Sequence, residues 1–317
     1  MKYRVCVGGL ALAFAVLSGT PLDAQDRRPL SAQQRNLATH GLAVTPFFEG
    51  WYPNANGTYT VSFGYFNRNR EEVVHLPVGP DNFIEPAEFD GTQPTLFSPR
   101  RDQGVFTITM PGDFAESGGR VVWTITAHGV THSVPGRIGV SDYALSHGAM
   151  AMGSLPPMLK LRRDGLELWG PMSTSGDPAT DPVALEGDGP IGSVRNPLPR
   201  TASVGTPLTL TIWVADRFDP EARGVGSDRE RIIPGVKWYT HQGPAPAKFG
   251  EESEPDEDGE GAEPEPDEDG EATTTATFSE PGTYVLRVRV DSFNDLEGSP
   301  GDQCCWTNGY ISVTVSP

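Results

Sequence analysis

The sequence predicts an all-β fold class, with two β-sandwich domains joined by a long connector rich in glycine and proline. The chain of 317 residues contains 30 prolines and 37 glycines, and few long helical patterns accompany them, which is typical of turn-rich β proteins. Short segments with a two-residue hydrophobic period recur between turn signals, as the strands of a sandwich do. The length is sufficient for two domains of ordinary size.

The N-terminus has the composition of a secretory signal peptide. Lys2 and Arg4 precede an apolar run that ends near residue 17, and small and polar residues follow up to Ala24. This arrangement predicts that residues 1–24 are a signal peptide. The run is too short to span a bilayer, so we expect no integral membrane span after its removal. The mature protein is expected to be exported, to the periplasm, the cell surface or the extracellular medium.

Most of the net negative charge comes from one segment. The formal net charge is −18, and thirteen of the acidic residues fall within 251–271, which has no Lys or Arg. Phosphate binding requires a basic face, which this composition does not supply. We therefore expect no nucleic-acid partner.

A first β-sandwich domain is predicted over residues 43–140, after a polar arm at 25–42. Turn residues at 54–57 precede the clearest two-residue period, and the same period returns after residues 105 and 120. No known family is recognised in this domain. The apolar residues that share these strand faces are Tyr59, Val61, Phe63, Tyr65, Phe106, Ile108, Met110, Val121, Trp123, Ile125 and Ala127.

Residues 141–203 are expected to form the connector between the domains. This segment is rich in Gly, Pro, Ser and Asp and has no sustained hydrophobic period. A structureless stretch of this length is unusual inside a compact domain. Five apolar residues are expected to pin part of it as a short hairpin: Leu159, Leu161, Leu166, Leu168 and Trp169.

The second domain is predicted over residues 204–317. Alternating apolar residues run from Leu208 to Val214, from Tyr284 to Val290 and from Ile311 to Val315. Each run predicts a strand with one face in the core. The acidic segment 251–271 interrupts the domain as an insert.

Several motifs of this domain resemble the PKD family of immunoglobulin-like domains. They are Trp238, the Gly243–Pro244 pair, "TATFS" at 275–279, "PGTYVLRV" at 281–288, Asp291 and "VTV" at 313–315. The resemblance implies an immunoglobulin-like sandwich, and a role as spacer, adhesion module or enzyme accessory in secreted or surface proteins. The chain departs from the family pattern in the acidic insert and in a long segment before the last strand.

The phrase EPDEDGE occurs twice in the acidic insert and partly fits a calcium-loop template. Glu254, Asp256, Asp258, Gly259 and Glu265 take the spacing of an EF-hand loop. However, prolines interrupt the loop and no helix flanks it. Because like charges repel and nothing organises them, we expect residues 251–271 to be a disordered insert that attracts cations only weakly.

A calcium site is predicted instead at one end of the second domain. In an antiparallel immunoglobulin-like sandwich, the loops 216–235 and 291–303 meet at the end where the acidic insert returns. Loops at a sandwich end are where binding usually resides. The candidate ligands are Asp216, Asp219, Asp291 and Asp295, and calcium is the cofactor that such a set of carboxylates would bind.

Two adjacent cysteines remain after the signal peptide is removed. Cys304 and Cys305 can pair with each other or with another chain in an oxidising compartment. A vicinal disulfide is the favoured interpretation, although adjacent Cα atoms, about 3.8 Å apart, are closer than in ordinary disulfides. Redox switching and copper binding are the alternatives.

A second copper alternative involves His147, Met150, Met152 and Met158, whose soft ligands suit Cu(I). Methionines in a connector more often cover apolar surface.

The sequence contains no recognisable catalytic motif: no Gly-x-Ser-x-Gly, no His-Glu-x-x-His and no phosphate-binding glycine loop. It therefore favours a non-enzymatic binding, adhesion or structural module. The expected partner is an envelope or extracellular protein or a polysaccharide. Two alternatives stay open. One is a carbohydrate-processing enzyme, or its accessory subunit, whose acids converge only in three dimensions. The other is a calcium-stabilised surface structural protein.

Overall fold

The computed structural model describes residues 39–54, 56–145, 154–170, 174–175, 191–218, 232–250, 263–292 and 306–317. These residues belong to one compact unit, Ala38–Pro317. The chain is all-β, as predicted, and the helical pieces within the described residues are short: η1 (Ala87–Phe89), α2 (Gly112–Glu116) and η2 (Ser141–Tyr143). In the part of the chain that the structure describes, no helix has the length and apolar character needed to cross a membrane. The predicted signal peptide lies outside the described residues.

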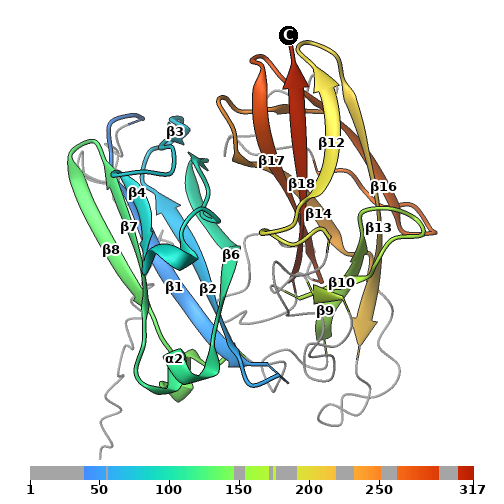
Figure 1. Ribbon diagram of the computed structural model, residues 1–317. Helices are drawn as coiled ribbons and strands as arrows, with labels where there is room; N and C mark the ends of the chain where they lie inside the picture. Colours follow the sequence, from blue (N-terminus) through green and yellow to red (C-terminus); the bar gives the residue numbers. More distant parts are fainter. Residues whose placement is uncertain are drawn as a thin grey trace, which may run out of the picture. The chain divides into compact units, whose positions relative to one another are not determined.

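The first sandwich consists of two three-stranded sheets and a short strand pair (Figure 1). One sheet has the order β1-β2-β6 and the other the order β4-β7-β8, while β3 pairs with β5. The strands are β1 (Val44–Pro53), β2 (Tyr59–Asn67), β3 (Val74–His75), β4 (Asn82–Glu85), β5 (Leu96–Phe97), β6 (Arg100–Met110), β7 (Val121–Ala127) and β8 (Val130–Gly136).

Trp123 occupies the centre of the first core. It packs edge-on against Phe106, with ring centroids 4.9 Å apart, and donates a hydrogen bond from Nε1 to Asn82 Oδ1 at 3.0 Å. The predicted inward residues Val61, Phe63 and Tyr65 are buried. At the start of the domain, the last residues of the predicted polar arm are held in place, because the Leu42 amide donates to Asn69 Oδ1.

The second sandwich has one six-stranded and one four-stranded sheet, and in Figure 1 the long strands β12, β18 and β17 run side by side. The six-stranded sheet has the order β11-β10-β9-β13-β16-β15, with β9 (Ser154–Lys160), β10 (Leu168–Trp169), β11 (Thr174–Ser175), β13 (Leu208–Phe218), β15 (Lys248–Phe249) and β16 (Glu271–Thr277). The four-stranded sheet has the order β12-β18-β17-β14, with β12 (Leu198–Ser203), β14 (Gly235–Gln242), β17 (Gly282–Asp291) and β18 (Trp306–Ser316).

This strand order is immunoglobulin-like. The neighbours β13-β16-β15 and β14-β17-β18 correspond to the B-E-D and C-F-G groups of that fold. Tyr284, at the start of β17, donates from its hydroxyl to the Glu280 carbonyl at 2.9 Å, which is the tyrosine-corner contact of such sandwiches. The predicted inward faces are confirmed, since Leu286, Val288 and Val313 are fully buried.

Part of the predicted connector belongs to the second sandwich. Strand β9 pairs with β13, and β12 pairs in parallel with β18, so this sandwich begins well before residue 204. The sequence does not predict β9, because Pro156 and Pro157 weaken its strand signal. The predicted hairpin is confirmed, because Leu168 pairs with Leu159 across β9 and β10.

Candidate functional site

Strand β6 carries a bulge where it meets the second sandwich. Phe63 of β2 pairs with Phe106 and Tyr65 pairs with Asp102, so residues 103–105 of β6 lie opposite Gly64 alone. Gly104 has a φ of +58°, in the left-handed region that favours glycine. The bulge frees the backbone groups of these residues from the regular β2–β6 pairing.

Glu49 satisfies the bulged amide from the opposite side. It lies at an irregularity of β1, between Phe48 and Gly50. Its Oε2 accepts hydrogen bonds from the Gly104 amide and from Ser62 Oγ, both at 2.9 Å. Its carboxylate crosses the face of β2 at Gly64, where a Cβ atom would come within 2.4 Å of Oε1. Burial raises the pKa of Glu49, although these hydrogen bonds oppose the shift.

Side chains from the outer face of the second sandwich cover the bulge carbonyls. Arg289 Nη1 donates to Gln103 O at 3.0 Å, and Tyr310 Oη donates to Val105 O at 2.8 Å. Arg287 Nη1 and Asn308 Nδ2 both donate to Gly104 O. We call this contact the junction: residues 102–105 of β6 together with the side chains of Arg287, Arg289, Asn308 and Tyr310.

Two ion pairs lie within or beside the junction. Arg287 donates to Asp102 Oδ2, and the two side chains are 1% and 5% exposed. Arg289 donates to Asp291 Oδ2 at 2.6 Å, with both side chains equally buried. Burial acts to lower the pKa of Arg287, but the carboxylate of Asp102 and the hydroxyls of Tyr239 and Tyr310 together outweigh it, so the pKa is raised and the guanidinium stays charged.

Aromatic rings complete the environment of both guanidiniums. Arg287 Cζ lies 4.0 Å from the centroid of the Tyr239 ring, and Arg289 Cζ lies 5.5 Å from that of Trp306. Such contacts suit arginine, whose planar group is only weakly hydrated. They help to explain how two cations can be buried on one strand.

A second set of hydrogen bonds joins the loop before β5 to the end of β14. The Thr95 amide donates to the His241 carbonyl at 2.8 Å, and His241 Nε2 donates to Thr92 O at 2.8 Å. Gln242 Nε2 donates to Gln93 O at 2.7 Å. Burial lowers the pKa of His241 to about 3, so this histidine is neutral at physiological pH.

A cavity of about 10 Å³ lies beside the junction, between Asp102, His241 and Arg287. Within the described residues, three buried atoms that belong to these side chains have no hydrogen-bond partner: Asp102 Oδ1, His241 Nδ1 and Arg287 Nε. Such a volume holds about one water molecule. It cannot admit a sugar ring.

The predicted calcium ligands are only partly described. Asp291 accepts a hydrogen bond from Arg289, which argues against it as a calcium ligand. Asp216 Oδ2 accepts one from the Ile232 amide at 3.3 Å, and Asp219 and Asp295 lie outside the described residues. No group of three or more candidate metal ligands occurs in the described ranges. The four-residue calcium site stays a prediction.

The other metal and disulfide predictions fall mainly outside the described residues. Cys304 and Cys305 lie there, as do His147, Met150 and Met152. Met158 is half-buried on β9, where it pairs with Ala215 of β13.

The expected disorder of residues 251–271 is wrong for 263–271. Glu263 Oε1 lies 3.0 Å from Lys237 Nζ, and the Lys237 side chain is 6% exposed. Asp267 Oδ1 accepts hydrogen bonds from the amides of Asp269 and Glu271, both at 2.9 Å. The repulsion between like charges was the basis of the prediction. It is overcome here by a buried cation and by a turn that leads into β16.

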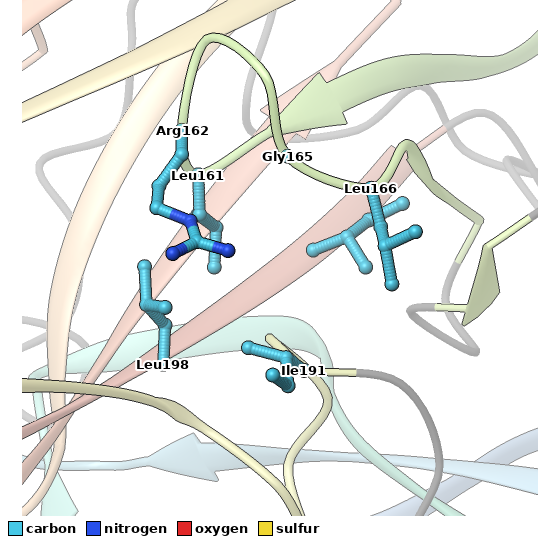
Figure 2. Close-up of a pocket in the computed structure, with 7 residues that line it drawn as sticks. Leu161, Arg162, Gly165, Leu166, Ile191 and Leu198 are labelled. Carbon is cyan, nitrogen blue, oxygen red and sulfur yellow. The ribbon is translucent and has the colours of Figure 1, made fainter.

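A second candidate site is an apolar groove on the second sandwich, beside the β9–β10 hairpin (Figure 2). Its volume is about 50 Å³. Leu166 and Ile191 are 55% and 46% exposed, while Leu161 and Leu198 are buried. We call this the groove; its lining residues are Leu161, Arg162, Gly165, Leu166, Leu168, Ile191 and Leu198.

Neither the junction nor the groove is predicted by the sequence. Arg287 and Arg289 alternate with core valines, and such alternation normally indicates a solvent-facing side. One signal was present, because an isolated glycine in a strand pattern, here Gly104, suggests a bulge or a close backbone approach.

No family model and no curated protein sequence matches the chain. Among solved structures, the D0-D1 domain of Intimin aligns with 12% sequence identity over 86% of this chain and 97% of that one, at a TM-score of 0.22. The two tandem V-type regions of VCBP3, a v-region-containing chitin binding protein, align with 9% identity over 87% of this chain and 100% of that one, at a TM-score of 0.25. TM-scores this low support no argument from either structure.

Proposed function

We propose that the protein is an exported, non-enzymatic module that binds or supports a component of the cell envelope or the extracellular matrix. In this proposal its two sandwiches act as one stiff unit. The observation that carries it is the buried ion pair between Asp102 and Arg287, which joins strands of the two sandwiches. Domains in one chain are expected to move relative to each other unless their contact is extensive.

The chemistry of the junction favours a single arrangement of the two sandwiches. Separating them would leave Arg287 and Asp102 without their partner and would break hydrogen bonds to the carbonyls of residues 103–105. A spacer or adhesion module benefits from such stiffness, because less conformational entropy is lost on binding.

The resemblance of residues 204–317 to PKD domains and the signal-like N-terminus support the same proposal. Such domains are usually spacers, adhesion modules or accessories in secreted or surface proteins. The partner that we propose is an envelope or extracellular protein or a polysaccharide.

Binding is tested by co-sedimentation of residues 25–317 with envelope fragments from the source cells. We expect saturable binding and no release of reducing sugar from the polysaccharide fraction. Sugar release without saturable binding would replace this proposal with the enzyme alternative. Absence of both would reject an envelope-binding role.

Stiffness is tested separately by NMR relaxation. We expect the amides of β7 and β17 to report one rotational correlation time. Two clearly different times would show that the sandwiches tumble independently.

A further inference from the structure

We propose that the groove binds an extended acidic segment of a partner protein through one aliphatic anchor residue. This inference rests on the proposed binding role and assigns it to a surface of the second sandwich. None of the groove's lining residues contributes a side chain to the junction.

The walls of the groove suit an aliphatic side chain. Leu161, Leu168 and Leu198 form its buried part, and Leu166 and Ile191 form an exposed rim. About 10–15 Å³ of such volume holds one water-sized group, so about 50 Å³ accommodates the branched end of one leucine or isoleucine. The two exposed rim residues would be covered by the partner, as apolar rims of binding sites usually are.

The groove is shaped by local backbone features that keep it open. The Gly165 amide donates to Arg162 O at 2.9 Å, which closes the hairpin turn, and the Gly192 amide donates to Asn196 O at 2.7 Å. Gly192 has a φ of +103°, and a Cβ atom there would come within 2.9 Å of both Leu161 and Leu168. The walls are therefore fixed by the fold before any partner arrives.

The charge beside the groove selects an acidic partner. Figure 2 shows the Arg162 side chain extending from the hairpin turn toward Leu198. Arg162 and Arg163 are both exposed, whereas the neighbouring Lys160 and Glu167 neutralise each other at 3.1 Å. At physiological ionic strength charges act over about 8 Å. Asp164 in the same turn is exposed too, so one net positive charge remains there despite the net charge of −18. Arg162, which lines the groove, places a guanidinium beside it.

A guanidinium next to an aliphatic cavity recognises a carboxylate adjacent to an aliphatic side chain. The probe is an acetylated and amidated peptide with one leucine flanked on each side by two glutamates. Its control peptides replace the leucine with serine or the glutamates with lysines. Binding to residues 25–317 is followed by methyl NMR of the leucines in the groove.

We expect the acidic leucine peptide to bind at least about tenfold more tightly than either control peptide. The variants R162E and I191S should each weaken its binding by about tenfold, a loss readily detected by titration. V130S is the matched control, because Val130 is 43% exposed on the first sandwich, and it should leave binding unchanged. Thermal melts establish that each surface variant is folded.

Several results would overturn the inference. They are absence of binding, equal binding of the lysine peptide, or binding that R162E and I191S do not alter. Self-association that I191S abolishes would assign the groove to a second copy, and binding to vesicles of anionic lipid in preference to the peptide would assign it to a membrane surface. In the envelope assay, co-sedimentation retained by the groove variants rejects the groove alone, whereas failure of the unaltered protein rejects the proposed function.

Discussion

Asp102 and Arg287 are 185 positions apart in the chain and form an ion pair that is almost completely buried. Their contact ties β6 of the first sandwich to β17 of the second. Because both charges are buried, the contribution of the pair to stability depends on both partners being present.

The first prediction concerns loss of this pair. D102A should lower the free energy of unfolding by about 3–5 kcal/mol, because it leaves the Arg287 guanidinium buried without its carboxylate. The double variant D102L/R287M should recover most of the loss. Urea unfolding measures both effects. In the exposed Lys160–Glu167 pair, E167A serves as the control and should cost no more than about 1 kcal/mol. Equal losses for D102A and E167A would contradict the structural role of the pair.

The second prediction concerns close approach at the bulge. A Cβ atom at Gly104 would lie 2.1 Å from Trp306 Nε1, so G104A must displace the indole as well as strain the backbone. Gly118 also has a positive φ, of +86°, but has nothing within 4 Å of its Cβ position. We expect G118A to cost about 1–2 kcal/mol from the backbone alone, and G104A to cost about 1–3 kcal/mol more from overpacking. Thermal melts compare the two, and similar losses would show that the junction can open without cost.

The third prediction is a pH dependence that originates at Glu49. Burial raises the pKa of this carboxyl above its ordinary value of 4.5, so the folded protein binds the proton more tightly than the unfolded chain does. The resulting stabilisation is complete below the ordinary pKa and is lost as the pH rises through the raised value.

E49Q should therefore flatten the pH dependence of stability just above pH 4.5, whereas E88Q at an exposed glutamate should preserve it. Denaturant midpoints measured across this range provide the comparison. An E49Q profile parallel to that of the unaltered protein would assign the slope to another group.

The fourth prediction separates the two copies of EPDEDGE. Asp267 accepts two backbone hydrogen bonds in the turn before β16, so D267A should lower stability by about 1–2 kcal/mol. Asp256 is the matching residue of the first copy, which prolines and like charges predict to be solvated. D256A should therefore change stability by less than about 0.5 kcal/mol. Urea unfolding of the pair is the measurement, and a loss for D256A as large as for D267A would place the first copy in the fold too.

The hydrophobic alternation along each strand predicts the two cores, but it does not predict the junction. The alternation around Leu286 and Val288 predicts which side of β17 faces the sandwich interior, because strand periodicity is a local property. It does not tell what covers the opposite side. Arg287 finds Asp102 only through the relative placement of two domains, which no short window of sequence encodes.

The same limit explains the acidic insert and the connector. Charge repulsion predicts disorder for 251–271, but the buried side chain of Lys237 lies beside Glu263. The composition of the insert does not predict this contact, because Lys237 lies elsewhere in the chain. Prolines made β9 look irregular, yet β13 supplies a pairing partner. In both segments, contacts with residues distant in the sequence stabilise a structure that the local sequence alone does not favour.

The bulge carbonyls of residues 103–105 have a further consequence. An outer strand of a sheet offers its backbone to any other chain that can add as a strand, and this is a common route to aggregation. Here arginine, asparagine and tyrosine side chains occupy those acceptors, and a bulge bends the strand at the same point. The contact that joins the sandwiches therefore also caps this part of β6 against intermolecular strand pairing. Variants that weaken the junction should therefore form fibrils or oligomers under conditions in which each sandwich is still folded.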